Sequence, residues 1–228
     1  MKPIECFIHH HLGLGDHLIC NGMVRYVAKN YDFKNIALVV KKCNLNNVTR
    51  MFSDLPQISF FAVDEDREFI EEYHSHLKSI PLLRAGFENC RNADFDKSFY
   101  DSVNVPFRER WDSWHVERES EQEKRLVEEL CLDEDYIFVH DKSSVGDYNL
   151  NISTDLRQIK PNKLESEKSI FDWMGIIENA KEVHAISSSF VHLIDSMELK
   201  NKLYFHDIKA AHGMGFSLKN NWEIVSYG

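Results

Sequence analysis

Hydrophobic and polar residues alternate along the chain in a pattern typical of short buried strands followed by amphipathic helices. The first strand is predicted at Ile4–His9 and the first helix at Leu18–Ala28, whose apolar residues recur with the helical period. Between them, Gly13-Leu14-Gly15-Asp16 forms a tight turn. A strand that runs through a glycine turn into a helix is the opening unit of many nucleotide-handling α/β domains.

The same alternation continues along the first part of the chain. It predicts strands at 35–40, 58–63 and 80–83, and helices at 44–55 and 67–77. The strand NIALVV is continuously apolar, as expected for a strand that is buried on both faces of a parallel sheet. We therefore expect a parallel sheet that is covered by helices on both faces.

The pattern stops between Phe87 and Trp114, a stretch that is rich in aromatic and charged residues and has Pro106 in its middle. Such a long loop is usually functional or connects two domains. Two interpretations are open: a crossing segment packed by its own aromatic side chains, or one wall of a substrate pocket. Glu117–Leu130 is predicted to be a strongly charged helix, suited to a solvated connector between two halves.

The α/β alternation restarts after this helix. It predicts strands at 136–139, 183–186 and 202–205, a helix at 169–180 and another helix that opens at 187–189. Residues 150–168 are hard to assign and leave room for a short strand at 150–152. We therefore expect two α/β halves, residues 1–115 and residues 116–228.

Two local signals refine the second half. Ser169 and Asp172 have the three-residue spacing of a capping box at a helix start. In the helix after residue 189, the apolar positions face the core at helical spacing, and His192 is expected on the opposite side with Asp195 near it.

The composition narrows the class of protein. The chain has 228 residues, of which 43% are hydrophobic and 15 are Phe, which is ample for a core. No apolar run approaches the ~20 residues that span a bilayer. The N-terminus, MKPIECFIHHH, has neither the long apolar segment nor the cleavage site of a signal peptide. We therefore expect a soluble protein of the cytoplasm, without a membrane span.

The cysteine content and the net charge argue against a disulfide-rich protein and against a protein that binds nucleic acid or membranes. Five cysteines without a CxxC pair predict free thiols rather than a disulfide framework. The formal net charge of −10 argues against nucleic acid or an anionic membrane surface as a partner. A local basic pocket for a phosphorylated small molecule is compatible with this charge, and the oligomeric state is not determined.

Gly13 and Gly15 are the first candidates for binding a donor nucleotide, because backbone N–H groups at a glycine-rich helix start attract anions. A dinucleotide-binding turn has a third glycine where this chain has Leu18, and an acidic residue where the second strand ends in Lys41-Lys42. Both departures disfavour an NAD-dependent dehydrogenase. Because no GxxxxGK[ST] motif occurs, a P-loop nucleotidase is excluded.

Asp16 is the strongest single candidate for chemistry. It lies where a strand edge meets a helix start, at the rim of the crevice expected there, and a carboxylate at that place can act as a general base. The alternative role is helix capping. His17 and His9-His10-His11 lie beside it. Since neighbours on a strand point to opposite faces, we expect one histidine to hydrogen-bond in the site and no metal centre.

The second half has its own candidates at a helix start. Ser187-Ser188-Ser189, with His192 one turn later, can hold a diphosphate through hydroxyl and amide groups, although plain capping is the alternative. His140 and Lys142 follow the strand at 136–139, and Arg157 lies in a loop of the same half. The cations among them can neutralise phosphate, or be merely solvated.

Three stretches together resemble a known family. The turn GLGDHLICNGMVRYV resembles the N-terminal glycine–aspartate motif of GT-B glycosyltransferases, especially the ADP-heptose:lipopolysaccharide heptosyltransferases. FDWMGIIENAKEVHAISSSFVHLIDSM is similar to their C-terminal helix–strand–helix, which holds the donor nucleotide. Between them, FYDSVNVPFRERW resembles a segment of small glycosyltransferase-like proteins of bacterial surface-polysaccharide clusters and large viruses.

The resemblance implies two Rossmann-like halves whose parallel sheets face a cleft, the first on the acceptor side and the second holding the nucleotide sugar. It implies inverting transfer of a sugar to a hydroxyl of a glycan acceptor, without a metal or another cofactor. Asp16 matches the family's base, with His17 beside it. Ser187–Ser189 and His192 match the region that contacts the donor phosphates, where the family carries Asp-Ser/Thr-Gly.

The acceptor side is less defined. His11, Arg108, Arg110 and Trp111 are our candidates there, since an aromatic plane suits a sugar face. Two other classes of function stay open. The altered serine motif and the small size suggest a non-catalytic nucleotide- or sugar-binding protein on the same fold. A nucleotide-sugar-modifying or dehydrogenase-like enzyme on a related fold is the third class.

Overall fold

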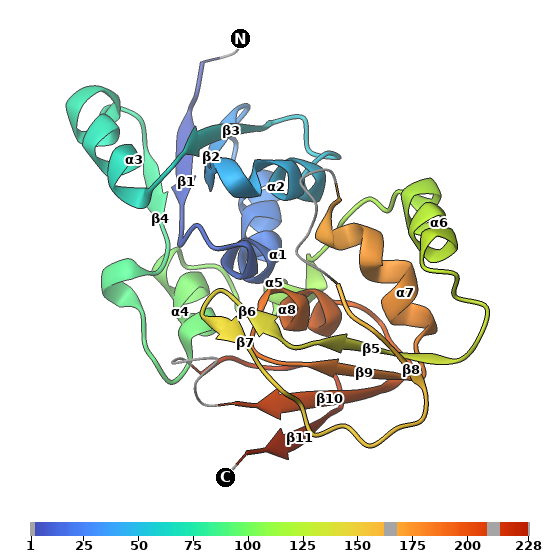
Figure 1. The fold of residues 1–228 in the computed structure, drawn as a ribbon. Coiled ribbons are helices and arrows are strands. Elements are labelled where there is room, and N and C mark those ends of the chain that lie inside the picture. Colours follow the sequence, from blue (N-terminus) through green and yellow to red (C-terminus); the bar gives the residue numbers. More distant parts are fainter. Residues whose placement is uncertain (1–2, 162–167, 209–214, 228) are drawn as a thin grey trace. The chain divides into compact units, whose positions relative to one another are not determined.

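The computed structural model describes residues 3–161, 168–208 and 215–227, which form two compact α/β units (Figure 1). The first unit holds the described residues up to 117 together with 215–217, and the second holds the remaining described residues. Each unit is built on its own parallel sheet. No helix in the described part of the chain is long and apolar enough to cross a membrane.

The first sheet has four parallel strands in the order β3-β2-β1-β4. Its strands are β1 (Cys6–His9), β2 (Ile36–Lys41), β3 (Ile58–Val63) and β4 (Leu82–Arg84). In β2 every residue before Lys41 is buried, as its apolar run predicted, because neighbouring strands flank it and helices cover it. The four strands predicted for this half are confirmed: β3 has its predicted bounds, and the other three have shifted ends.

The helices of the first unit follow the strands in alternation. They are α1 (Leu14–Asn30), α2 (Leu45–Met51), α3 (Asp66–Glu72) with a π-helical turn (Tyr73–Leu77), α4 (Phe95–Ser102) and α5 (Glu109–Asp112). Short 3₁₀ turns lie at Lys42–Asn44 and Phe87–Asn89. The helix α1 begins four residues earlier than its apolar stripe predicted, because the glycine turn is itself part of the first helical turn.

One face of the first sheet carries a cluster of aromatic and aliphatic side chains. The ring of Phe7 on β1 lies 5.4 Å from Phe69 of α3 and 5.7 Å from Phe61 of β3. Val39 and Val63 complete this core with no exposed surface. This apolar contact packs α3 against the sheet and thereby fixes the place of the residues that begin α3.

The stretch from Phe87 to Trp114 is not a loop, contrary to the prediction, since it holds α4 and α5. Phe99 and Tyr100 on α4 are completely buried, and the Tyr100 hydroxyl donates to the carbonyl of Ile19 at 2.7 Å. These tertiary contacts stabilise helices too short to show a helical period. The interpretation as a segment packed by its own aromatic side chains fits this arrangement.

The second sheet has five parallel strands in the order β11-β10-β9-β5-β8. They are β5 (Tyr136–His140), β8 (Arg157–Ile159), β9 (Glu182–Ala185), β10 (Lys202–Asp207) and β11 (Trp222–Ser226). A small antiparallel hairpin, β6 (Lys142–Ser143) and β7 (Gly146–Asp147), follows β5. The strand β11 was not predicted, and no strand forms at 150–152.

The helices of the second unit are α6 (Ser120–Glu129), α7 (Met174–Asn179), preceded by a 3₁₀ turn at Ile170–Trp173, and α8 (Ser189–Ser196). Figure 1 shows α7 and α8 on the same side of the sheet. The predicted capping box is confirmed: Ser169 accepts from the N–H of Phe171, and Asp172 accepts from the N–H of Ser169 at 2.8 Å.

The charged helix α6 exposes most of its side chains, as its charge pattern predicted, and it packs on the second unit through two buried residues. Its Leu126 is buried, and so is Glu123, whose carboxylate accepts a hydrogen bond from Arg118 at 2.8 Å. Arg118 also pairs with Glu178 at the end of α7. The pairing with Arg118 therefore allows Glu123 to be buried, although the charge pattern alone predicted that it is exposed to solvent.

Candidate active site

The glycine turn after β1 holds Asp16 against the start of α1. Gly13 directly precedes the helix, and a Cβ atom at that residue would lie 2.6 Å from Oδ2 of Asp16. Only glycine therefore leaves room for the carboxylate to fold back over the helix start. Gly15 lies half-buried in the same helical turn. The predicted turn thus places Asp16 at the carboxyl end of β1.

Asp16 is poised between its two protonation states at neutral pH. Burial raises the pKa of Asp16 to about 7, against the N–H groups of Gly13 and of Asp16 itself, which favour the charged form. The negative charge of Asp66 raises this pKa further. A carboxylate whose pKa lies near the operating pH is well suited to accept a proton from a hydroxyl.

His10 and His17, on either side of the turn in the sequence, pack against each other inside the unit. Both side chains are fully buried, and their rings are 4.4 Å apart between centroids. Burial lowers the pKa of His10 to about 3 and the pKa of His17 well below its usual value, so both rings are neutral. We therefore withdraw His17 as a catalytic residue, because a side chain without exposed surface does not reach a substrate.

His11 is half-buried and is engaged on several sides. Its Nε2 accepts a hydrogen bond from the N–H of Phe87 at 3.1 Å, and the Cys90 sulfur lies 3.7 Å from the same nitrogen. Its ring packs against Phe87 and Phe99. Because Nε2 already accepts a hydrogen bond, the proposed contact of His11 with the acceptor would use another part of the imidazole ring.

The structure brings two further charged residues to the carboxyl end of the first sheet. Asp66, the first residue of α3, binds Nε2 of the buried His9 through Oδ1 at 3.1 Å. Arg84, the last residue of β4, stacks its guanidinium 4.1 Å from the centre of the Phe87 ring. Sequence reasoning missed both, although Arg84 ends one parallel strand and Asp66 follows another, and both strands have their carboxyl ends at the same edge as Asp16.

Two of the three candidate acceptor residues at 108–111 are packed within the unit. Arg110 is 1% exposed and forms an ion pair with Asp96, which also accepts a hydrogen bond from the N–H of Ser217 at 2.8 Å. Trp111 is half-buried against Phe107, with ring centroids 5.3 Å apart. Arg108 is 77% exposed in its side chain. We withdraw Arg110 from the acceptor candidates, since its charge is used inside the fold.

In the second unit, His140 and Ser188 meet at the carboxyl ends of β5 and β9. The Ser188 hydroxyl and Nδ1 of His140 form a hydrogen bond of 2.9 Å, and the His140 ring packs on Phe190 at 4.4 Å between centroids. Burial lowers the pKa of His140 to about 4, so this ring is neutral. Because its hydroxyl bonds to His140, Ser188 does not cap α8 with its side chain.

The amino terminus of α8 is therefore available to an anion. Its first N–H groups receive no cap from Ser188, and Ser187 and Ser189 beside them are half-buried. His192, by contrast, is buried within α8, contrary to the prediction that it faces away from the core. The Asp195 carboxylate accepts hydrogen bonds from the N–H groups of Lys219 and Asn220, so it holds the following segment in place.

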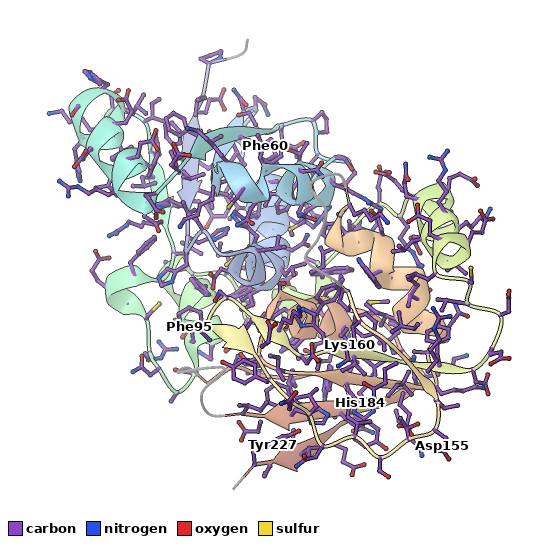
Figure 2. All side chains as sticks on the ribbon, viewed as in Figure 1. Phe60, Phe95, Asp155, Lys160, His184 and Tyr227 are labelled. Atoms are coloured by element: carbon purple, nitrogen blue, oxygen red, sulfur yellow. The ribbon has the colours of Figure 1, made fainter. Side chains whose placement is uncertain are left out.

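Two lysines lie near the same strand ends. Lys142 on β6 pairs with Asp147 at 3.3 Å. Lys160, which sequence reasoning missed, directly follows β8 and binds Oδ2 of Asp141 at 2.6 Å (Figure 2). Arg157 begins β8 at the opposite edge and donates to the carbonyl of Cys131 at 3.0 Å, so it is not part of this group.

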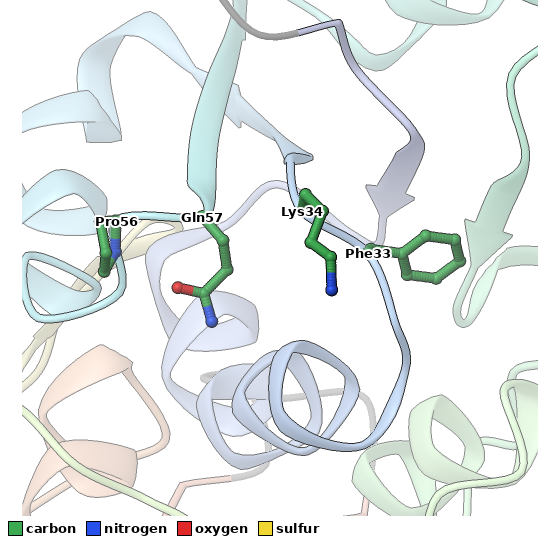
Figure 3. A pocket seen from close by; sticks show the side chains of 4 residues that line it. All are labelled: Phe33, Lys34, Pro56 and Gln57. Atoms are coloured by element: carbon green, nitrogen blue, oxygen red, sulfur yellow. The ribbon is translucent and has the colours of Figure 1, made fainter.

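A cavity of about 310 Å³ lies elsewhere in the first unit, between Phe33, Lys34, Pro56 and Gln57 (Figure 3). These residues precede β2 and β3, so the cavity lies at the amino edge of the sheet, opposite to Asp16. Among the described residues, no group of three or more His, Cys, Asp or Glu side chains is placed to hold a metal ion.

The two units are Rossmann-like α/β domains, and solved structures with the same fold are glycosyltransferases of the GT-B type. A family 9 glycosyl transferase from Veillonella parvula superposes with a TM-score of 0.60 and 10% identity, over 99% of this chain and 88% of the other. ADP-heptose lipopolysaccharide heptosyltransferase II of E. coli superposes with a TM-score of 0.58 and 10% identity, over 97% and 90%.

A third similar structure is the iron-containing dodecameric glycosyltransferase TibC from enterotoxigenic E. coli, with a TM-score of 0.53 and 11% identity. The alignment covers 94% of this chain but only 62% of TibC. Comparison of the amino-acid sequence with protein-family profiles and with curated proteins gives no match. The resemblance to the GT-B glycosyltransferases is thus confirmed at the level of the fold.

Proposed function

We propose that this protein is a glycosyltransferase that moves a sugar from a nucleotide-activated donor to a hydroxyl of a glycan acceptor. The observation that carries the proposal is the place of Asp16: a carboxyl group with a pKa of about 7, folded over a glycine turn at the carboxyl end of a Rossmann-like sheet. Similar folds at 10% identity belong to glycosyltransferases, among them an ADP-heptose heptosyltransferase.

In the proposed reaction Asp16 removes the proton from the acceptor hydroxyl while that oxygen attacks the anomeric carbon. The bond from this carbon to the nucleotide diphosphate breaks on the opposite side of the sugar, so the anomeric configuration inverts. We place the acceptor in the first unit, with His11, Trp111 and Arg108 as further candidate contacts. The proton ends on Asp16 and the electron pair on the diphosphate.

The leaving diphosphate is placed in the second unit, at the amino terminus of α8. Uncapped N–H groups and the partial positive charge of a helix start stabilise the developing anion. Ser187, Ser189 and the Ser188–His140 pair border this place. Lys142 and Lys160 lie near the same strand ends, but each already pairs with a carboxylate, Asp147 and Asp141 respectively, so the proposed stabilisation rests on the N–H and hydroxyl groups. Because these groups supply the charge stabilisation, the proposed mechanism uses no metal ion and no other cofactor.

The first test is a thermal-shift screen with UDP-, GDP-, ADP-, dTDP- and CMP-linked sugars. A ligand that binds only the folded protein stabilises it by about 2.7 kcal/mol at a hundredfold excess over Kd. Transfer by the stabilising donor is then measured with Asp16→Asn and with the exposed control Asp32→Asn. We expect Asp16→Asn to lower kcat by about 10²–10⁴-fold without weakening donor binding, and Asp32→Asn to leave it unchanged.

Normal turnover of the Asp16→Asn variant would refute the proposed base. Donor binding without transfer to a broad panel of acceptors would instead favour a non-catalytic nucleotide-sugar-binding protein. The replacement of the family's Asp-Ser/Thr-Gly by three serines is the feature that favours this second function. A thermal shift with NAD alone would contradict both.

A further inference from the structure

The strand ends around Asp16 form a charged surface whose cations are already paired. We call it the charged edge; it consists of the following residues: Lys41, Lys42, Asp64, Glu65, Asp66, Arg84 and Glu88. They lie at the carboxyl ends of β2, β3 and β4 or in the segments that follow these strands, at the same edge of the sheet as the turn that holds Asp16. This surface borders the place where the proposed function puts the acceptor.

Each cation of the charged edge has its own carboxylate. Lys41 binds Oε2 of Glu65 at 2.9 Å, and Lys42 binds Oδ2 of Asp64 at 2.6 Å. Arg84 binds Oε2 of Glu88 at 2.6 Å, and its guanidinium also stacks on the Phe87 ring. These pairs are at the surface, where an ion pair contributes about 1 kcal/mol or less, so an anionic ligand has to compete with the carboxylate for each cation.

The balance of charge remains negative even when these pairs open. The charged edge has three cations and four carboxylates, and Asp16 is a fifth acidic group beside them. The remaining carboxylate, Asp66, bonds to His9, whose pKa burial lowers to about 4, so this imidazole adds no positive charge at pH 7. A second anion brought to this surface meets net repulsion.

Arg108, close in sequence to the buried Arg110, is an exposed cation that does not belong to the charged edge. It directly precedes Glu109, whose backbone packs against Gly22 of α1. Gly22 is six residues beyond Asp16, roughly 9 Å along the helix. The backbone beside Arg108 therefore lies nearly two helical turns along α1 from Asp16, and the Arg108 guanidinium pairs with Glu109 at 3.7 Å.

We propose that the acceptor of this protein is uncharged at the sugar residue that presents its hydroxyl to Asp16. This inference rests on the proposed function and adds the substrate class to it. An uncharged sugar keeps the ion pairs of the charged edge intact and offers hydroxyl groups that hydrogen-bond to carboxylates. A uronic acid or a sugar phosphate at the same position adds a negative charge without a free cation at this edge to receive it.

The test compares matched acceptors that differ only in this charge. Methyl hexopyranosides are assayed against the corresponding methyl hexopyranosiduronates and methyl hexopyranoside 6-phosphates, with a pool of UDP-, GDP-, ADP-, dTDP- and CMP-linked sugars as donors. We expect kcat/KM for the uncharged member of each pair to be about tenfold higher or more. Raising the ionic strength should narrow the difference, because salt screens the repulsion.

Two variants test the role of the charged edge itself. Glu65→Gln and Glu88→Gln, made together, leave Lys41 and Arg84 without their carboxylates, so we expect kcat/KM for the anionic acceptors to rise severalfold while the uncharged acceptors change little. Glu72→Gln, an exposed position at the far end of α3, removes an acidic charge away from the edge and should change neither.

Preference for the hexuronosides or the phosphates by the unaltered protein would overturn the inference while leaving the transferase proposal intact. Equal use of both acceptors at low and high salt would overturn it as well. Failure of every donor to bind would refute the proposed function, and the inference about the acceptor would fall with it.

Discussion

Gly22→Ala tests whether the close approach of α5 to α1 holds the segment after α4 in place. A Cβ atom at residue 22 would lie 2.7 Å from the carbonyl carbon of Glu109 and 3.1 Å from Cα of Arg110. Carbon atoms in contact are normally about 3.5–4.0 Å apart, so the backbone of α5 must move by roughly 1 Å. The carbonyl oxygen of Glu109 would lie closer still, and all three clashing atoms belong to the backbone, which cannot rotate out of the way.

The cost follows from what this movement breaks. Overpacking costs about 1–3 kcal/mol. The same shift strains two hydrogen bonds of 3.1 Å between the side chain of Asn21 and the backbone of His115, each worth about 1 kcal/mol. Alanine gains about 1 kcal/mol over glycine within a helix. We therefore expect Gly22→Ala to lower the free energy of unfolding by about 2 kcal/mol, the overpacking and the lost bonds outweighing the gain.

Urea and thermal unfolding measure this effect, with Gly146→Ala as the matched control. The nearest atom to a Cβ at Gly146 is the Tyr148 hydroxyl at 4.0 Å, so the control has room. For a chain of this length, 2 kcal/mol corresponds to a decrease in Tm of about 4–8 °C. A Gly22→Ala protein as stable as the unaltered chain would refute the close approach of α5 to α1.

Three further predictions follow from the turn that carries Asp16. Asp66→Asn removes a negative charge that raises the pKa of Asp16, so the acidic limb of the kcat/KM profile should shift to lower pH; an unchanged profile would contradict the coupling. Burial lowers the pKa values of His10 and His17, so the unfolded chain takes up protons first as the pH falls below about 6.5. The free energy of unfolding is then fully retained above this pH and decreases below it by up to ~1.4 kcal/mol per pH unit for each histidine. Urea titrations at pH 7 and 5 measure this decrease. The His10→Phe variant should show a smaller decrease between these two pH values, and a decrease as large as in the unaltered protein would contradict the role of His10. Gly13→Ala displaces the Asp16 carboxylate, so it should abolish transfer at a stability cost of about 1 kcal/mol, and full activity would disprove the folded-back carboxylate.

Hydrophobic patterning was sufficient for the elements with strong periodicity. The strand at 58–63 was predicted at its observed bounds, and the continuous apolar run before Lys41 indicated the buried strand β2. The spacing of Ser169 and Asp172 indicated their capping box. These features depend on residues close in sequence, whose local preference and burial agree.

Elements that depend on distant contacts escaped the pattern. The helix α4 forms because the Tyr100 hydroxyl reaches the carbonyl of Ile19, 81 residues away. The helix α6 contains a buried Glu123 that pairs with Arg118, and Arg118 also reaches Glu178 of α7, 60 residues away. Neither partner is visible in the local period of hydrophobic residues, and a charge pattern cannot distinguish a solvated carboxylate from a paired one.

For the candidate site too, some features were predictable from the sequence and others depend on the tertiary structure. The sequence by itself determined the glycine turn and the place of Asp16, because only a residue without Cβ leaves room for the carboxylate beside the helix start. Tertiary structure alone decided that His17 and Arg110 are buried, and that Asp66 and Lys160 join the strand ends instead. A sequence specifies which chemical groups are present, whereas their solvent exposure and charge partners are determined only when strands far apart in the chain meet at one edge of a sheet.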